Sequence, residues 1–347
     1  MARDAITPQG EQDERDCRGD GHGSVDATTT INLARTRRCD LAMRVLVTGG
    51  AGFIGSTLAE ALIVRGHDVV VVDDLSRGCR DYVPSGATLH VCDIASIDLR
   101  ALLCSRQPEV VFHLGAHIDL RRSIADPLLD TRINVLGTVN LLQACVEAGT
   151  TRLVFASSGA VYGDTSALPI KETHPLRPSS PYGAAKQSGE VYGHAFQRLH
   201  GLQFVALRYA NVYGPRQQSE GEAGVVAIFS HQMLHDEPAV INGDGAQTRD
   251  FVHVDDVVRA NIRAMETEHV GVYNVGTGRE TDVNTVYSLL ARACGSRRAP
   301  IHGPAKPGDA RRGSLDIRLA DEMLGWRPQV ELEQGLSDMV AYCGVRR

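Results

Sequence analysis

The chain has 347 residues, of which 43% are hydrophobic, and a formal net charge of −6 with both signs well mixed. This length allows a large core in one big or two moderate domains, and the charge provides no basic field for holding nucleic acid. The eight cysteines are scattered without a Cys-x-x-Cys pair, which is typical of reduced thiols rather than of a disulfide or zinc framework. No apolar run approaches the roughly 20 residues of a spanning helix, so we expect a cytoplasmic protein with neither a membrane nor a nucleic-acid partner.

Residues 1–42 are polar and rich in glycine and charge, without a sustained apolar period. Such a segment cannot bury enough apolar surface to offset the entropy of ordering. We therefore expect a disordered N-terminal extension. Met43 stands directly before the first predicted strand and is an alternative start for the folded protein.

A glycine-rich turn follows between a predicted strand, Arg44–Val47, and a helix that ends near Gly66. Gly49, Gly52 and Gly55 stand at three-residue intervals in this turn. The first glycine permits the turn, the second lets a pyrophosphate approach the backbone, and the third allows close packing of helix and strand. The anion would bind the unpaired N–H groups of the helix N-terminus. The pattern predicts a dinucleotide site.

Two carboxylates follow the next apolar run, about 20 residues beyond the glycines. Asp73 and Asp74 come directly after Val69–Val72. A carboxylate at this position accepts hydrogen bonds from the adenosine ribose and repels a 2′-phosphate. We expect NAD as the cofactor, although the nearby Arg77 leaves NADP open.

Predicted strands and helices alternate through the first half of the chain. Alternation of this kind predicts a doubly wound α/β fold, in which a parallel sheet carries helices on both faces. The segments concerned are the strands Val69–Val72, Thr88–Val91, Val110–Leu114 and Arg152–Ala156, and a helix over Val135–Ala148 that ends at Gly149.

Two histidines, His113 and His117, have a spacing of four residues that would suit a metal pair. They follow a buried strand, however, and neither a carboxylate nor a third histidine accompanies them in zinc spacing. We therefore predict no metal site. The strand end and the turn after it are expected to line the cofactor, as the carboxyl ends of strands do in open sheets.

A second chemical motif comes after the strand Arg152–Ala156. Ser157 and Ser158 place hydroxyls at the carboxyl edge of the sheet, and Tyr182 and Lys186 lie one turn apart in a helix that runs to about His200. A lysine ammonium and the positive nicotinamide both favour the phenolate, so they would lower the pKa of Tyr182 from about 10. Tyr182 is then expected to act as a general base.

These motifs together resemble the extended short-chain dehydrogenase/reductase family of nucleotide-sugar enzymes, and within it most closely the bacterial UDP-glucose 4-epimerases. The resemblance covers nearly everything from Met43 to the C-terminus. It is carried by Gly49–Gly55, Asp73, Asp93-Ile94, His113–Ala116, Asn134, Ser157-Ser158, Tyr182-x-x-x-Lys186 and Arg208–Pro215.

The resemblance implies a role for each matching position. Tyr182 would be the base, Lys186 would hold the nicotinamide ribose and tune Tyr182, and Ser158 would hydrogen-bond the sugar O4. The implied cofactor residues are Gly49, Gly52, Phe53, Ile54 and Gly55 at the pyrophosphate, Asp73 and Asp74 at the adenine ribose, Asp93 and Ile94 at the adenine, and Leu114, Gly115, Ala116 and Asn134 on the nicotinamide side.

The same resemblance implies a UDP-sugar substrate bound by a smaller C-terminal α/β domain. A helix N-terminus at Gly224-Val225 could receive a phosphate, and cations with a carboxylate suit a nucleoside diphosphate. The loop Pro215–Glu222 is polar, and we expect it to be mobile.

Family relatives are commonly homodimers joined by helices equivalent to Val135–Ala148 and Tyr182–His200. The candidate substrate residues are Ser158, Asn211, Val225, Arg249, Lys306 and Asp309. We expect an NAD-binding domain at residues 43–210, to which a segment near 248–275 returns. The substrate domain is expected at residues 211–247 and 276–347.

The two residues after Ser158 narrow the choice of reaction. Related dehydratases and decarboxylases need acidic side chains there, whereas this chain has Gly159 and Ala160, which cannot transfer a proton. We expect 4-epimerisation of UDP-glucose and UDP-galactose. Gly313 stands where a bulky side chain closes the pocket beside the sugar 2-substituent in some epimerases, so N-acetylated sugars are also expected as substrates. UDP-glucuronate or UDP-pentose epimerisation, dehydration, 4-ketosugar reduction and catalytically silent NAD binding stay open as alternatives.

Overall fold

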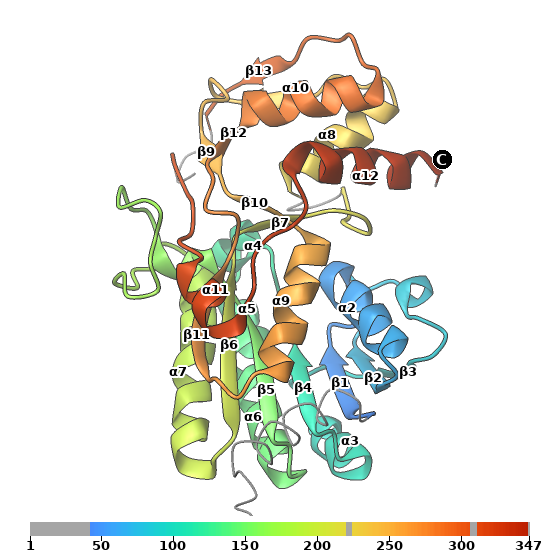
Figure 1. Ribbon diagram of the computed structural model, residues 1–347, viewed down its shortest axis with the longest axis vertical. Helices are drawn as coiled ribbons and strands as arrows, with labels where there is room; N and C mark the ends of the chain where they lie inside the picture. The colour runs from blue at the N-terminus through green and yellow to red at the C-terminus, as the bar shows by residue number, and fades with distance from the viewer. Residues whose placement is uncertain (1–41, 220–223, 306–310, 346–347) are drawn as a thin grey trace, which may run out of the picture. The chain divides into compact units, whose positions relative to one another are not determined.

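A seven-stranded parallel sheet organises the chain in the computed structural model, which describes residues 42–219, 224–305 and 311–345. The strand order is β11-β6-β5-β4-β1-β2-β3 (Figure 1). The order reverses between β1 and β4, and ligands of open α/β sheets bind at the carboxyl ends beside such a point. The strands are β1 (Arg44–Thr48), β2 (Asp68–Asp73), β3 (Thr88–Val91), β4 (Val110–His113), β5 (Arg152–Ser158), β6 (Gln203–Tyr209) and β11 (Gly271–Val275).

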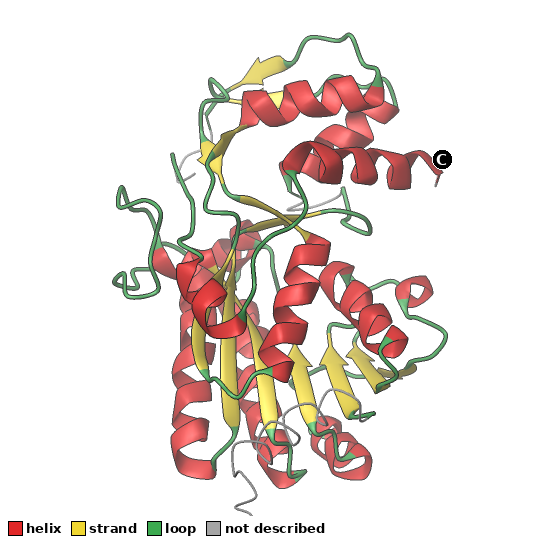
Figure 2. Ribbon diagram, in the orientation of Figure 1, coloured by secondary structure: helices red, strands yellow, loops and turns green. Residues whose placement is uncertain are grey.

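Helices cover both faces of this sheet, so the predicted doubly wound α/β class is confirmed (Figure 2). In β1, Val45 and Val47 belong to the core on one face, and Leu46 belongs to the core on the other. Strands buried on both faces are apolar at every position, which explains the continuous valine run of β2. One face carries α2 (Phe53–Val64), α9 (Val254–Glu266) and α11 (Arg318–Leu324), and the other carries α3 (Asp98–Arg106), α6 (Gly137–Glu147) and α7 (Pro181–His200).

The helix predicted over Val135–Ala148 differs from the observed one at its start. The α-helix α6 begins at Gly137, and a π-helical turn, Thr131–Leu136, precedes it. The helical path starts earlier still, at α4 (Leu120–Ala125) and α5 (Pro127–Asp130). This earlier start could not be predicted from a hydrophobic stripe, because the sequence signal there is a helix cap. Asp126 caps α5 by accepting from the Leu129 N–H, and Pro127 occupies the first turn.

The strand predicted at Arg152–Ala156 continues to Ser158. Ser157 and Ser158 pair with Arg208 and Tyr209 of β6, so the hydroxyl residues belong to the strand itself. The helix predicted around Tyr182 is confirmed as α7. Ser180 caps it by accepting from the Gly183 N–H at 3.1 Å, and Gly201 ends it in the left-handed region at φ 73°.

A further hydrophobic core forms in the C-terminal part of the chain. It joins the helices α8 (Val225–Leu234), α10 (Val283–Cys294) and α12 (Leu332–Val345) around Phe229, Tyr287 and Leu336. The two-stranded ladders of this part are β7 (Asn211–Tyr213) with β10 (Phe251–His253), β8 (Val240–Asn242) with β13 (Ile301–Gly303), and β9 (Thr248–Arg249) with β12 (Thr281–Asp282). This core supports the predicted substrate domain, whose boundaries we keep as a proposal. Across the three described ranges, no helix combines the length and apolarity needed to cross a membrane.

Candidate active site

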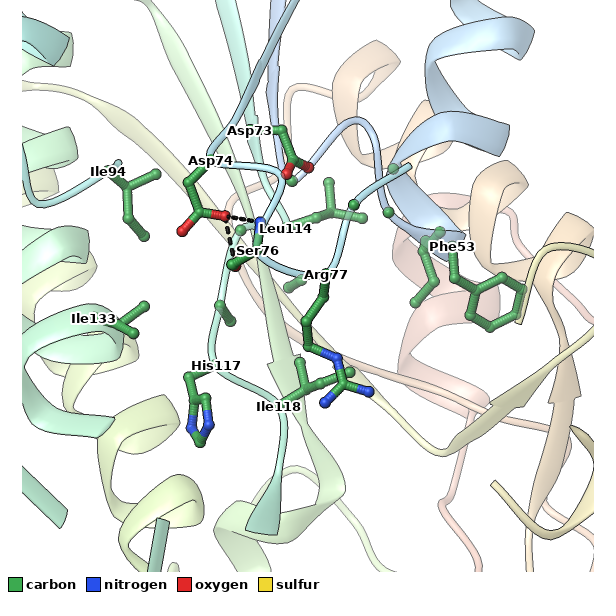
Figure 3. A pocket seen from close by; sticks show the side chains of 18 of the residues that line it. Phe53, Asp73, Asp74, Ser76, Arg77, Ile94, Leu114, His117, Ile118 and Ile133 are labelled. Atoms are coloured by element: carbon green, nitrogen blue, oxygen red, sulfur yellow. Dashed lines mark hydrogen bonds between the residues drawn. The ribbon is translucent and has the colours of Figure 1, made fainter. Parts of the chain in front are cut away.

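A cavity of about 530 Å³ lies where the glycine turn, the end of β2 and the loop after β4 meet (Figure 3). Almost every residue predicted to bind the cofactor lines it; the exception is Asn134. The predicted residues in its wall are Gly49, Gly52, Phe53, Ile54, Gly55, Asp73, Asp74, Asp93, Ile94, Leu114, Gly115, Ala116, Tyr182 and Lys186.

The glycine turn has the geometry of an anion cradle. Gly49 adopts φ +68°, a conformation that side chains disfavour, and a Cβ on Gly55 would collide with the Gly49 carbonyl. Gly52 is the N-cap of α2, and no side chain caps the first turn of that helix. Among the described contacts, the first N–H groups of α2, at Phe53, Ile54 and Gly55, therefore remain for a ligand, and the absence of a Cβ at Gly52 lets a phosphate approach. These features fit the pyrophosphate of a dinucleotide.

Asp73 has a structural role beside its predicted one. Its carboxylate accepts from the Ala51 N–H at 3.0 Å and from the Leu75 N–H at 2.9 Å. It thus joins the glycine turn to the loop after β2. Burial raises the pKa of Asp73, although these two hydrogen bonds oppose the shift. Asp74 instead accepts from Ser76, as the dashed lines of Figure 3 show.

Asp93 is held by an ion pair that sequence reasoning did not include. Arg132 Nη2 lies 2.8 Å from Asp93 Oδ2, and the other carboxylate oxygen accepts from the Ala95 N–H. Arg132 itself lines the cavity, as do Tyr82 and Arg122. Sequence patterns could not single out these side chains, because they lie on helical turns between strands and carry no motif of their own.

Tyr182 and Lys186 line another part of the same cavity, and Ser158 lies behind this wall, beside Tyr182. The Ser158 side chain lies close enough to the Tyr182 phenol to favour its ionised form. Lys186 is buried, and its Nζ donates to the Ala156 carbonyl at 2.8 Å. The same Nζ is 5.9 Å from the centre of the Tyr182 ring. The predicted triad is therefore assembled, with the ammonium near the phenol rather than bonded to it.

The expectation that Lys186 lowers the pKa of Tyr182 is not met in the protein alone. Burial raises the pKa of Tyr182 to about 12, although the nearby Ser158 side chain opposes the shift. Burial also lowers the pKa of Lys186 to about 8. Desolvation decides the direction of this shift, because a buried phenolate loses the hydration that stabilises its charge. A bound nicotinamide would add a second positive charge that favours the phenolate.

The two histidines have different surroundings. His113 is buried between Thr48 Oγ1 at 2.8 Å and Thr138 Oγ1 at 3.0 Å, and burial lowers its pKa to about 3. It is thus a neutral core residue. His117 lines the cavity and lies 3.2 Å from Asp130. Among the residues with described positions, no three His, Cys, Asp or Glu side chains gather as a metal site.

Most of the predicted substrate residues lie outside the cavity wall. Asn211 is exposed at the start of β7, Val225 opens α8, and Arg249 is half-buried in β9 with Nη1 donating to the Thr248 carbonyl. Ser158 contacts Tyr182 but is not itself among the lining residues. Lys306 and Asp309 lie outside the described residues.

The first part of the loop expected to be mobile makes defined contacts. Arg216 pairs with Glu60 of α2 at 2.5 Å, and Gln218 Nε2 donates to the Arg77 carbonyl at 2.8 Å. Gln217 and Gln218 line the cavity. Residues 220–222 of the predicted loop lie outside the described ranges. The segment 214–219 is therefore part of the cavity wall.

The model of the NAD dependent epimerase/dehydratase family matches residues 45–276. The chain belongs to this family. The predicted resemblance and the NAD cofactor are thereby confirmed. A curated family member, UDP-glucose 4-epimerase of Mycolicibacterium smegmatis, is 46% identical over 307 residues, which are 86% of this chain and 98% of the relative.

Two solved structures of this epimerase/dehydratase family are similar over nearly their whole length. The UDP-glucose 4-epimerase of Thermotoga maritima with UDP-glucose has a TM-score of 0.86 at 44% identity, covering 88% of this chain and 99% of that one. The UDP-N-acetylglucosamine 4-epimerase of Methanobrevibacter ruminantium, in complex with UDP-N-acetylmuramic acid, has a TM-score of 0.85 at 34% identity, again covering 88% and 99%.

Proposed function

We propose that this protein is an NAD-dependent UDP-sugar 4-epimerase that interconverts UDP-glucose and UDP-galactose. The observation that carries the proposal is the placement of Tyr182 and Lys186 in the wall of the cavity that also holds the glycine turn, with Ser158 beside Tyr182. Relatives named as UDP-glucose 4-epimerases, similar over most of the chain, support the same activity.

The chain's own groups each carry a separate part of the reaction. The first turn of α2 binds the pyrophosphate, and the loop after β4 closes the nicotinamide side. Tyr182, as phenolate, takes the proton from the sugar O4 and later returns it, while Ser158 positions that oxygen. NAD, held by the glycine turn and the loop after β2, would supply a reversible hydride acceptor for sugar C4. The reaction is then an isomerisation without net redox change.

The residues after Ser158 argue against dehydration and decarboxylation. Gly159 and Ala160 form the start of a 3₁₀ turn, Gly159–Tyr162, and neither carries a side chain that can transfer a proton. The Ala160 N–H instead donates to Ser158 Oγ at 3.2 Å. A general acid and base for eliminating water are therefore missing where such enzymes need them.

Gly313 supports acceptance of N-acetylated sugars as a second substrate class. A Cβ built on Gly313 would meet no atom within 4 Å among the described residues, so a larger side chain fits there, although Gly313 is not one of the residues that line the cavity. The similarity to a UDP-N-acetylglucosamine 4-epimerase agrees with this extension. We therefore include UDP-GlcNAc and UDP-GalNAc among the substrates.

Incubation of the purified protein with single UDP-sugars, monitored by NMR, tests the proposal. UDP-galactose, UDP-GalNAc and UDP-glucuronate are supplied separately without added cofactor, beside a Tyr182→Phe control. We expect each accepted sugar to convert to its C4 epimer, and the control to lose this activity at least about 100-fold because the base is gone. If all three sugars stay unchanged after NAD is supplied, the 4-epimerase assignment fails. Stoichiometric consumption of added NADH would instead indicate a 4-ketosugar reductase.

The homodimer and the cytoplasmic location remain predictions. Large apolar side chains are exposed on the two helices that the resemblance assigns to the dimer interface, including Leu136 and Val191. Burial of such a patch against a second copy would remove it from water.

A further inference from the structure

His117 occupies an unusual position in the cavity wall. It belongs to the loop after β4, more than nine-tenths of its surface is buried, and its ring is seen on the wall in Figure 3. The proposed mechanism gives it no role. Its ring atom Nε2 is buried and has no hydrogen-bond partner among the described residues. A buried polar atom without a partner is costly, so its position calls for an explanation.

Two buried side chains hold His117 in place. The Asn134 amide bonds its backbone in both directions, accepting from the His117 N–H at 2.8 Å and donating to its carbonyl at 2.8 Å. Asp130, fully buried at the end of α5, lies 3.2 Å from His117 Nδ1 and also accepts from Asn134 Nδ2 at 2.9 Å. Asn134, predicted to border the nicotinamide, thus acts through His117.

The contact with Asp130 determines which ring nitrogen of His117 is left to bind a ligand. A carboxylate only accepts, so Nδ1 carries the proton that it donates to Asp130. Nε2 is then an acceptor in the neutral ring and a donor in the charged ring. A hydroxyl group can complement either state, because it both donates and accepts.

The His117–Asp130 pair lies beside the reacting groups. The helix α5 packs against α7, and the charge of Asp130 acts on both Tyr182 and Lys186. We propose that His117 is a further ligand-positioning residue, whose Nε2 binds a sugar-type hydroxyl group at the reacting end of the cavity while Asp130 and Asn134 hold the ring. The hydroxyl belongs to either the cofactor ribose or the hexose, and its use in turnover rests on the proposed function.

Two substitutions separate this role from a purely structural one. His117→Asn keeps an amide where Nδ1 faces Asp130 but removes the group at Nε2. His117→Gln reaches the Nε2 position but gives up the contact with Asp130. A ligand-positioning role predicts that Gln is tolerated and Asn is not. A role confined to pairing with Asp130 predicts the opposite order.

The experiment measures three quantities for the wild type and both variants, after circular dichroism has shown that they fold. These are NAD retained per chain, the Kd of UDP-glucose against that of UDP by calorimetry, and turnover. If Nε2 binds a hydroxyl of the hexose, His117→Asn should weaken UDP-glucose binding about three- to tenfold and leave UDP binding unchanged. If Nε2 binds a hydroxyl of the cofactor ribose, His117→Asn should instead retain less NAD per chain. In either case His117→Gln should restore most of the loss.

The proposal is overturned if both variants match the wild type, if both are equally impaired, or if His117→Asn is the better tolerated. Failure of the proposed function would look different, because the wild type itself would then bind UDP-glucose no better than UDP and leave it unconverted. Retention of NAD by the two variants would still decide the role of His117 in that case.

Discussion

At the scale of a single residue, Lys186 is a buried side chain of the candidate site whose charge destabilises the folded protein. Burial lowers its pKa to about 8 from a usual value of about 10.5, which means that folding disfavours its charged form. Between these two pKa values the unfolded chain binds more protons than the folded one, so stability rises with pH in this window. At neutral pH the buried charge lowers the stability of the fold.

Lys186→Met should remove this pH dependence. The unfolding free energy of the wild type, relative to the variant, should increase by about 2 kcal/mol between pH 7 and pH 9.5. Urea unfolding at a series of pH values measures this difference. Lys171→Met, which removes an exposed lysine, serves as the control. A difference between wild type and Lys186→Met that is constant over this pH range would refute the buried-charge explanation.

Gly313 gives a second prediction at this scale. Gly313→Tyr should fill the open space beside the sugar 2-substituent, and it should reduce turnover of UDP-GalNAc about ten- to hundredfold while UDP-galactose keeps most of its rate. Separate kcat/KM measurements with the two sugars test this. Gly313→Ala is the matched control, because it adds only a methyl group. Unchanged turnover of UDP-GalNAc by Gly313→Tyr would show that Gly313 does not face this substituent.

At the scale of elements, the segment 214–219 joins two parts of the chain that are distant in sequence. Arg216 reaches Glu60 at 2.5 Å and Ser56 Oγ at 3.3 Å on α2, the helix whose first turn is expected to hold the pyrophosphate. Arg216 adopts φ 72°, a backbone conformation that costs a non-glycine residue some free energy. The contacts made by its side chain help to offset that cost.

Loss of the Arg216–Glu60 pair should therefore loosen this wall of the cavity. Arg216→Ala and Glu60→Gln should each speed the release of bound NAD about two- to fivefold, as expected for a partly exposed ion pair. The double variant should add little to either single one, because both remove the same contact. NAD in ultrafiltrates over time gives the rate. Arg327→Ala, which breaks an ion pair with Asp321 of α11, is the control. Equal rates in wild type and Arg216→Ala would refute the role of this segment.

The proposed dimer belongs to the scale of the whole molecule. Val191 and Leu136 are 61% and 59% exposed on helices of the predicted interface. The chain should elute at twice the mass of one copy, and Val191→Asp and Leu136→Asp should each raise the dimer dissociation constant about 100-fold by burying a charge. Light scattering over a dilution series measures this. Val64→Asp tests an equally apolar position on α2, 81% exposed, which should leave the dimer intact. A wild-type monomer at micromolar concentration would contradict the interface.

Local patterns determined the parts of this protein that depend on short-range physics. The glycine turn, the end of α7 at Gly201 and the apolar strands were all predictable, because backbone conformation and hydrophobic period depend on consecutive residues. The same patterns predicted Ser158, Tyr182 and Lys186. Their order along strand and helix is enough to bring them to one edge of a parallel sheet.

Only the tertiary structure decided what depends on burial and on contacts between distant residues. It pairs Arg132 with Asp93, and it brings the segment 214–219 into contact with α2. It also positions His117 between the cavity and Asp130. It also raised the pKa of Tyr182, where the sequence suggested the reverse. Desolvation and charge pairing depend on three-dimensional surroundings, which no spacing along the chain specifies.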